Sequence, residues 1–187
     1  MATAADPRDS ALERYGNGAV ALHWIIAALI IVNLLLGLFH EDFARETRSS
    51  MMLIHKSTGI TILVLSLVRL AWRLAHRPPA FDPVLKRWEA SLARVTHWLF
   101  YALMILLPLS GWLLSSTGKN PIGWFGLFDV PKLPADRSTH ELWEESHQIL
   151  GYGMIALVVL HVAGALKHHF EGHRHLIGRM APWARGR

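Results

Sequence analysis

Four apolar segments limit the kinds of fold open to this chain. They cover about residues 19–39, 51–72, 95–114 and 145–170, and each is close to the roughly 20 residues that a helix needs to span a bilayer core. Inside lipid a segment must satisfy its own backbone hydrogen bonds, so segments of this length form helices. Charged residues are rare within them, which makes a soluble bundle a poor alternative. We therefore predict an all-α fold, a four-helix transmembrane bundle.

Basic residues gather on one side of the predicted bundle. Of the 19 Lys and Arg residues, 13 belong to the two tails and to the region around the loop between the second and third segments, whereas the other two loops carry 6 with 8 acidic residues. The positive-inside rule then predicts that both termini are cytoplasmic. The net charge of +5 therefore reflects membrane orientation, and we predict no nucleic-acid binding. Residues 1–18 lack the apolar core of a signal peptide, so the first segment is expected to remain as an anchor.

The loops and helix ends carry local signals. The stretch 84–92 is amphipathic and is expected to lie on the inner membrane surface. The loop 115–138 is too apolar for a plain solvent loop, and we expect it to fold over the outer end as a lid. Ser138 to Glu141 has the capping-box pattern, which predicts the start of the fourth helix, and Pro108 predicts a kink in the third.

Histidines provide the strongest functional signal. His147 and His161 are 14 residues apart, and His168 follows 7 residues later, so the three imidazoles share one helix face. His147 and His161 are then separated by roughly 21 Å along the helix axis. Because successive helices alternate in direction, His55 matches the depth of His147, and His23 matches that of His161. Two axial imidazoles per iron is the ligation of a b-type haem that transfers electrons. The bundle is therefore predicted to bind two b-type haems through these pairs.

Small residues lie one helical turn after each member of these pairs. Gly59 follows His55 by four residues and Gly151 follows His147 by four, which leaves room for a porphyrin against the helix. Ordinary helix packing also uses small residues, but four matched positions favour a cofactor site. Zinc is the competing metal, and it prefers three or four close ligands rather than pairs at two depths. The chain has no cysteine, which excludes disulfides, iron–sulfur clusters and covalent haem attachment.

Two interpretations remain open for the cationic inner end, where His97 and His168 lie near Arg73 and Arg94. These side chains could anchor the helix ends by placing their charges at the membrane surface. Alternatively, His97 and His168 could contact a quinone headgroup and exchange its protons, with Arg73 holding haem propionates.

At these residues the chain resembles the bacterial cytochrome b561 family of inner-membrane dihaem proteins. The matching pieces are LHW (22–24), IHKSTGI (54–60), LPLSGW (107–112) and LHVAGALKHHF (160–170), within a resemblance that extends from about residue 15 to 182. The resemblance is closest to the branch that passes electrons from superoxide to membrane ubiquinone. It implies an oxidoreductase of the bacterial inner membrane, with haem ligation by the four paired histidines.

In one respect the chain differs from what a protein that takes electrons from superoxide would be expected to show, namely the charge of its outer loops. The outer loops carry more acidic than basic residues, so no general field attracts an anion. Lys56, next to His55, is therefore the best candidate for a superoxide contact, with Lys119, Lys132 and Arg137 behind it.

Two other classes of function stay open. The chain could be a membrane anchor that relays electrons for a dehydrogenase or hydrogenase partner, or a haem-binding sensor without turnover. The predicted organisation is a cytoplasmic tail (1–18), a transmembrane dihaem domain (19–170) and a basic cytoplasmic tail (171–187).

Overall fold

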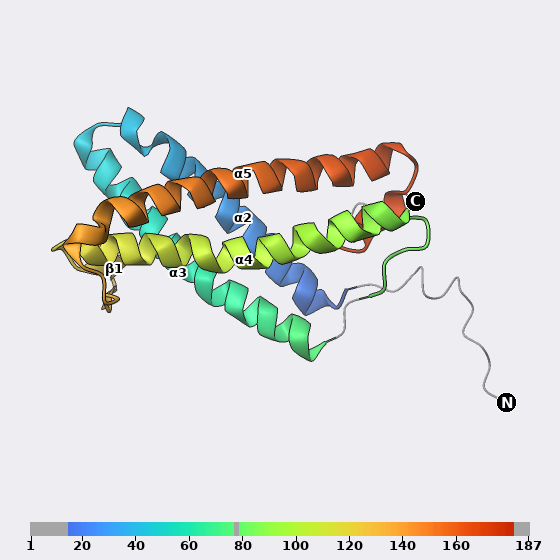
Figure 1. The fold of residues 1–187 in the computed structure, drawn as a ribbon, viewed down its shortest axis with the longest axis horizontal. Helices are drawn as coiled ribbons and strands as arrows, with labels where there is room; N and C mark the ends of the chain where they lie inside the picture. Colours follow the sequence, from blue (N-terminus) through green and yellow to red (C-terminus); the bar gives the residue numbers. More distant parts are fainter. Residues whose placement is uncertain (1–14, 77–78, 182–187) are drawn as a thin grey trace.

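The computed structural model describes residues 15–76 and 79–181, and its main feature is a bundle of long helices (Figure 1). The long helices are α2 (Asn17–Phe39), α3 (Arg45–Ala75), α4 (Arg87–Thr117) and α5 (His140–Phe170). Within the described residues these four are long and apolar enough to cross a membrane. The predicted four-helix transmembrane fold is confirmed. Three of the helices extend well beyond the predicted apolar segments, because polar residues at their ends continue the helical turns.

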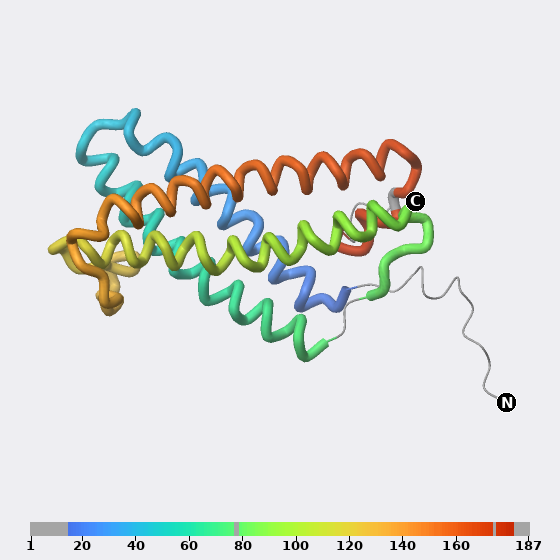
Figure 2. Tube along the Cα trace, viewed as in Figure 1, coloured from blue at the N-terminus to red at the C-terminus, as the bar shows by residue number. Residues whose placement is uncertain are grey.

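Consecutive helices pack side by side, α2 against α3, α3 against α4 and α4 against α5 (Figure 2). At one end, α2 begins and α5 ends beside the short helix α6 (Arg174–Gly178), and we call this the α6 end. There, Trp24 Nε1 donates to the Met180 carbonyl at 2.7 Å. The first and last described parts of the chain therefore meet at the same end. Much of both predicted tails, including Arg185 and Arg187, lies outside the described residues.

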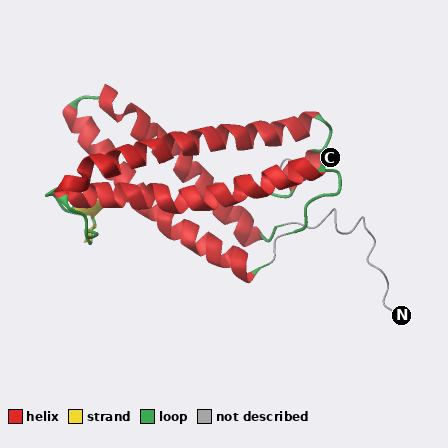
Figure 3. Ribbon diagram, in the orientation of Figure 1, coloured by secondary structure: helices red, strands yellow, loops and turns green. Residues whose placement is uncertain are grey.

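The opposite end, which we call the hairpin end, carries the two short strands β1 (Ile122–Trp124) and β2 (Phe128–Val130) (Figure 3). They pair antiparallel. The Phe125 amide donates to Ser57 Oγ at 2.8 Å, and Trp124 Nε1 donates to Thr61 Oγ1 at 3.2 Å, which fastens the hairpin to α3. The apolar loop thus folds back onto the bundle, as predicted.

The interior core is small for a chain of this length. Its buried cluster consists of Ile26, Ile30, Ile62, Tyr101, Met104 and Met154. Many large apolar side chains face outwards instead, including Leu35, Val64 and Leu160. In water such a surface would be costly, whereas in a bilayer it contacts lipid tails of the same polarity. The burial pattern therefore agrees with an integral membrane protein.

Three local features refine the sequence-based picture. The fourth helix begins where it was predicted, at His140, but the helical turn before it is capped by Asp136, whose Oδ1 accepts from the Ser138 amide at 2.8 Å, so the predicted capping box with Ser138 as the cap is wrong. Residues from Arg87 onwards belong to α4, so the amphipathic stretch 84–92 is not a separate helix. The same helix continues through Pro108, where a kink remains a prediction.

Candidate functional site

The histidines that were paired by depth face one another at the hairpin end. His55 on α3 and His147 on α5 have ring centres 6.0 Å apart, with their planes at 88°. Two imidazoles that bind one metal ion from opposite sides, each nitrogen at about 2 Å, have ring centres about 6 Å apart. The residues of this pair therefore fit a single iron held between them.

Main-chain carbonyls fix the proton on each of these rings. His55 Nδ1 donates to the Asn33 carbonyl at 3.1 Å, and His147 Nδ1 donates to the Leu107 carbonyl at 3.0 Å. Ser110 Oγ lies 3.1 Å from the same nitrogen of His147. Because a carbonyl only accepts, the neutral ring carries its proton on Nδ1 and leaves the Nε2 lone pair free. This is the tautomer that a metal-binding imidazole needs.

Two glycines on the neighbouring helices make room for the rings. A Cβ added at Gly37 would lie 3.1 Å from His55 Cε1, and one added at Gly111 would lie 2.7 Å from His147 Cε1. Each glycine lies four residues after the residue whose carbonyl the histidine contacts. Gly37 follows Asn33 on α2, and Gly111 follows Leu107 on α4. Neither glycine was predicted from the sequence, because the spacing rule covers only the position four residues after each histidine on the same helix.

A cavity of about 730 Å³ lies between the helices around this pair, within the usual range for cofactor sites. The predicted small residues Gly59 and Gly151 both line it, and an added Cβ at Gly151 would meet nothing within 4 Å. Its charged and titratable lining, apart from the pair, consists of His40, Glu41, Lys56, Glu141, Glu144, Glu145 and Tyr152. Lys56 therefore borders the cavity, but acidic side chains outnumber it there, and its contact with superoxide remains a prediction.

A second group of imidazoles lies towards the α6 end. His23 on α2 and His161 on α5 have ring centres 6.4 Å apart, which again matches the predicted pair. His97 on α4 lies 6.1 Å from His161, ring centre to ring centre. The helices therefore bring three imidazoles together here. The sequence predicted His23 and His161 as the ligand pair and His97 only as a nearby quinone contact.

Arginines surround this second group. Arg69 Nη1 lies 3.1 Å from His23 Nδ1, and a guanidinium only donates, so neutral His23 carries its proton on Nε2. For His23 to bind a metal ion through Nε2, the proton must move to Nδ1, and Arg69 must then give up its hydrogen bond to that nitrogen. Arg73, predicted to hold a propionate, instead lies over two aromatic rings, 5.8 Å from the centre of Trp98 and 5.5 Å from that of Tyr101.

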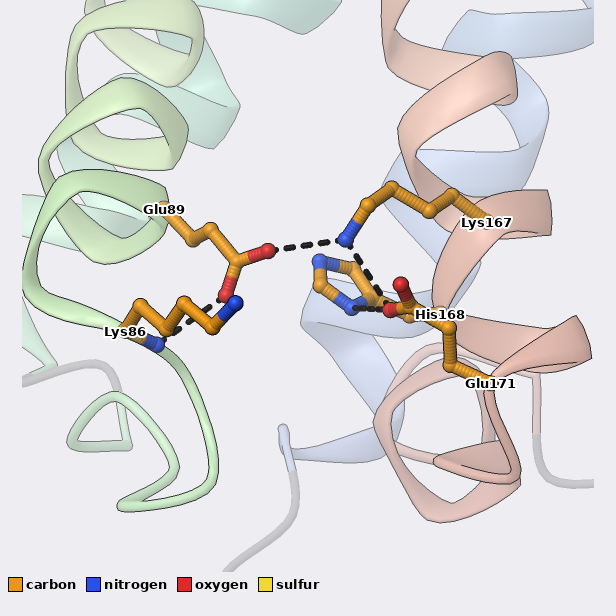
Figure 4. A network of polar contacts seen from close by, with 5 residues as sticks. All are labelled: Lys86, Glu89, Lys167, His168 and Glu171. Atoms are coloured by element: carbon orange, nitrogen blue, oxygen red, sulfur yellow. Dashed lines mark hydrogen bonds and ion pairs between the residues drawn. The ribbon is translucent and has the colours of Figure 1, made fainter.

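The other predicted inner-end residue, His168, lies in the last turn of α5. Its Nδ1 is 3.4 Å from Glu171 Oε2, and Figure 4 shows the ring within a network that extends to Glu89 on α4. Lys167 connects the two helices, at 2.8 Å from a Glu89 oxygen and 2.9 Å from a Glu171 oxygen.

A bundle of membrane-spanning helices with facing pairs of imidazoles in its interior is the architecture of a membrane-bound b-type cytochrome. Residues 14–183 match the prokaryotic cytochrome b561 family, and the chain belongs to that family. It is a membrane electron-transfer protein, and the family implies that it binds haem b.

Two relatives cover most of the chain. Cytochrome b561 homolog 2 of Escherichia coli (strain K12) is 32% identical over 165 residues, which are 84% of this chain and 86% of the relative. Probable superoxide oxidase CybB of Yersinia pestis is 29% identical over 175 residues, which are 93% of this chain and 99% of the relative.

Gly111→Ala tests the close contact at the hairpin-end pair. The new methyl group would displace the His147 ring, so we expect a loss of thermal stability equivalent to about 1–3 kcal/mol and a fall in haem b content. Gly153→Ala on α5 is the matched control, since an added Cβ there meets nothing within 4 Å. Thermal unfolding and a pyridine haemochrome assay measure both effects. Equal haem content in the two variants would show that the ring position is unimportant for haem binding.

Proposed function

We propose that the protein binds two b-type haems and conducts electrons from a donor at the hairpin end to ubiquinone at the α6 end. The observation that carries this proposal is the presence of two facing histidine pairs in one bundle, His55 with His147 and His23 with His161. Haem iron supplies the one-electron chemistry when it is bound. The protein orients the imidazoles and excludes water.

The positive-inside distribution supports an orientation for this pathway. The α6 end carries most of the basic residues, so we place it at the cytoplasmic face of the bacterial inner membrane, with both termini inside. The hairpin end then faces outwards. Electrons would enter through the outer pair and leave near the inner pair.

Superoxide is the donor that we propose. The Yersinia relative is named as a probable superoxide oxidase, which supports this choice, and Lys56 provides a cation beside the cavity. Each superoxide gives up one electron and becomes dioxygen. Two superoxide ions are therefore needed to reduce one ubiquinone, which also takes up two protons to form ubiquinol.

The acidic side chains around the cavity favour a second candidate. Glu41, Glu141, Glu144 and Glu145 repel a small anion but would attract a basic surface of another protein. In that case the chain would relay electrons for a dehydrogenase or hydrogenase subunit that docks at the hairpin end.

We place ubiquinone near the inner pair, with His97 and His168 as its contacts. The nearness of His97 to His161 supports this site, because a quinone bound at His97 would be close to the inner haem. An imidazole can donate a hydrogen bond to a quinone carbonyl and pass on a proton. Arg73 lies on the same side of the bundle and remains our candidate for a propionate partner.

The ligand assignment predicts how haem is lost. The purified protein should show a six-coordinate low-spin spectrum with about two haems per chain. His55→Ala and His147→Ala should lose the same haem, whereas His23→Ala and His161→Ala should lose the other. Redox titration with optical detection distinguishes them. A single haem or a high-spin spectrum in the unmodified protein would refute the assignment.

A pulse of superoxide tests the donor. Superoxide generated by pulse radiolysis should reduce the haems, and added ubiquinone should reoxidise them. Lys56→Gln should slow reduction by about threefold or more, because it removes the cation nearest the outer pair. Arg45→Gln, which removes a positive charge at the start of α3 at the same end of the bundle, should have little effect. If superoxide leaves the haems oxidised, the relay for a protein partner becomes the better proposal.

The quinone contacts are tested by reoxidation. In His97→Leu and His168→Leu, superoxide should still reduce the haems, but reoxidation by ubiquinone should slow by about tenfold or more, since a bond and a proton donor are lost. His169→Leu is the control, because it changes the adjacent residue of the same type. Unchanged reoxidation in the first two variants would place the quinone elsewhere along the bundle.

A further inference from the structure

The C-terminal end of α5 has a backbone motif that brings two histidines together. The His173 amide donates to the His168 carbonyl at 2.9 Å, and the Gly172 amide donates to the His169 carbonyl at 3.2 Å. Gly172 has φ of 89°, so this is a Schellman motif. The motif places the side chains of its first and last residues in contact, usually as an apolar pair. Here that pair is His168 and His173, with ring centres 6.2 Å apart.

These two imidazoles and a carboxylate form a cluster of metal-binding atoms. Donor atoms of His168, Glu171 and His173 all lie within 4.8 Å of one another. Within the described residues, Nδ1 of His168 and Nδ1 of His173 are buried and make no hydrogen bond, and His168 Nδ1 lies 3.4 Å from Glu171 Oε2. A buried nitrogen without a partner is destabilising unless something satisfies it. Apolar packing does not explain why two such nitrogens converge beside a carboxylate.

Two features of the cluster favour a bound cation, although this end of the bundle is rich in basic residues. The hydrogen bond from Lys167 lowers the pKa of the Glu171 carboxyl, which keeps it ionised. The C-terminal end of α5 adds the negative end of a helix dipole. Lys167 also contacts Glu89 at 2.8 Å, so it keeps an acidic partner if Glu171 turns towards a bound ion (Figure 4).

We propose that His168, Glu171 and His173 bind a divalent transition-metal ion of the zinc type at the α6 end. Two imidazole nitrogens and one carboxylate oxygen leave a fourth, tetrahedral position for water, and nitrogen ligands favour zinc over calcium or magnesium. Ligand atoms around one zinc ion are about 3.4 Å apart, so the side chains need only a modest closure. This site shares His168 with the proposed quinone contacts, but it contains none of the proposed haem ligands.

Zinc titration of the haem-loaded, detergent-solubilised protein tests the site, with a purification tag that contains no histidine. Calorimetry or competition with a chromophoric chelator should show one saturable high-affinity zinc per chain. His173→Ala and Glu171→Gln should weaken that binding by about tenfold or more, since each removes a ligand. His169→Ala is the matched control and should bind zinc as the unmodified protein does.

The outcomes separate this proposal from the electron-transfer function. Glu171 and His173 have no part in the proposed haem or quinone contacts, and an unchanged haem spectrum in each variant shows that the bundle is intact. Zinc K-edge absorption should report nitrogen and oxygen ligands, including two imidazoles. No saturable binding, or equal binding by all three variants and the unmodified protein, would overturn the site whatever the result of the superoxide experiment.

Discussion

The site depends on how a polar ring is held inside an apolar bundle. An imidazole buried without a partner is costly, and at the hairpin end each ring is satisfied by a main-chain carbonyl, that of Asn33 or Leu107. In a regular helix such a carbonyl already accepts from the amide four residues later, and its second lone pair is available to the ring. That later residue is Gly37 or Gly111, so nothing blocks the approach. The same arrangement of carbonyl and glycine occurs on α2 and α4, so both imidazoles carry their proton on Nδ1 and leave Nε2 free.

The second group is supported in a different way. His23 contacts the guanidinium of Arg69 rather than a carbonyl, so its proton is on the opposite nitrogen. The two ends of the bundle therefore offer different electrostatic surroundings, one set by backbone dipoles and one by full positive charges. An electron carrier at the charged end would be easier to reduce than one at the hairpin end. That order agrees with electron flow from the hairpin end towards the α6 end.

The sequence predicts depth along the membrane better than it predicts orientation around a helix axis. Helix rise and alternating direction place His55 opposite His147 and His23 opposite His161, because both depend only on residue number and topology. The contact between Arg69 and His23 depends on how α2 and α3 are rotated, which no spacing rule fixes. The Asp136 cap and the contact between His168 and His173 depend on the backbone conformation of the turns at the helix ends, which helical periodicity does not describe. For the same reason the glycines opposite the histidines could not be assigned from the sequence.

Each histidine pair also joins separate parts of the bundle. His23 and His55 come from the first two helices, whereas both of their partners come from α5. The two halves already pack together through α3 and α4, but the apolar core that they share is small, so a further link between them would stabilise the bundle in lipid. In the proposed ligation each haem would therefore act as a cross-link between helical hairpins that had entered the membrane independently. Assembly of the bundle would then be governed by cofactor supply, and chains made without haem would remain open to quality-control proteases.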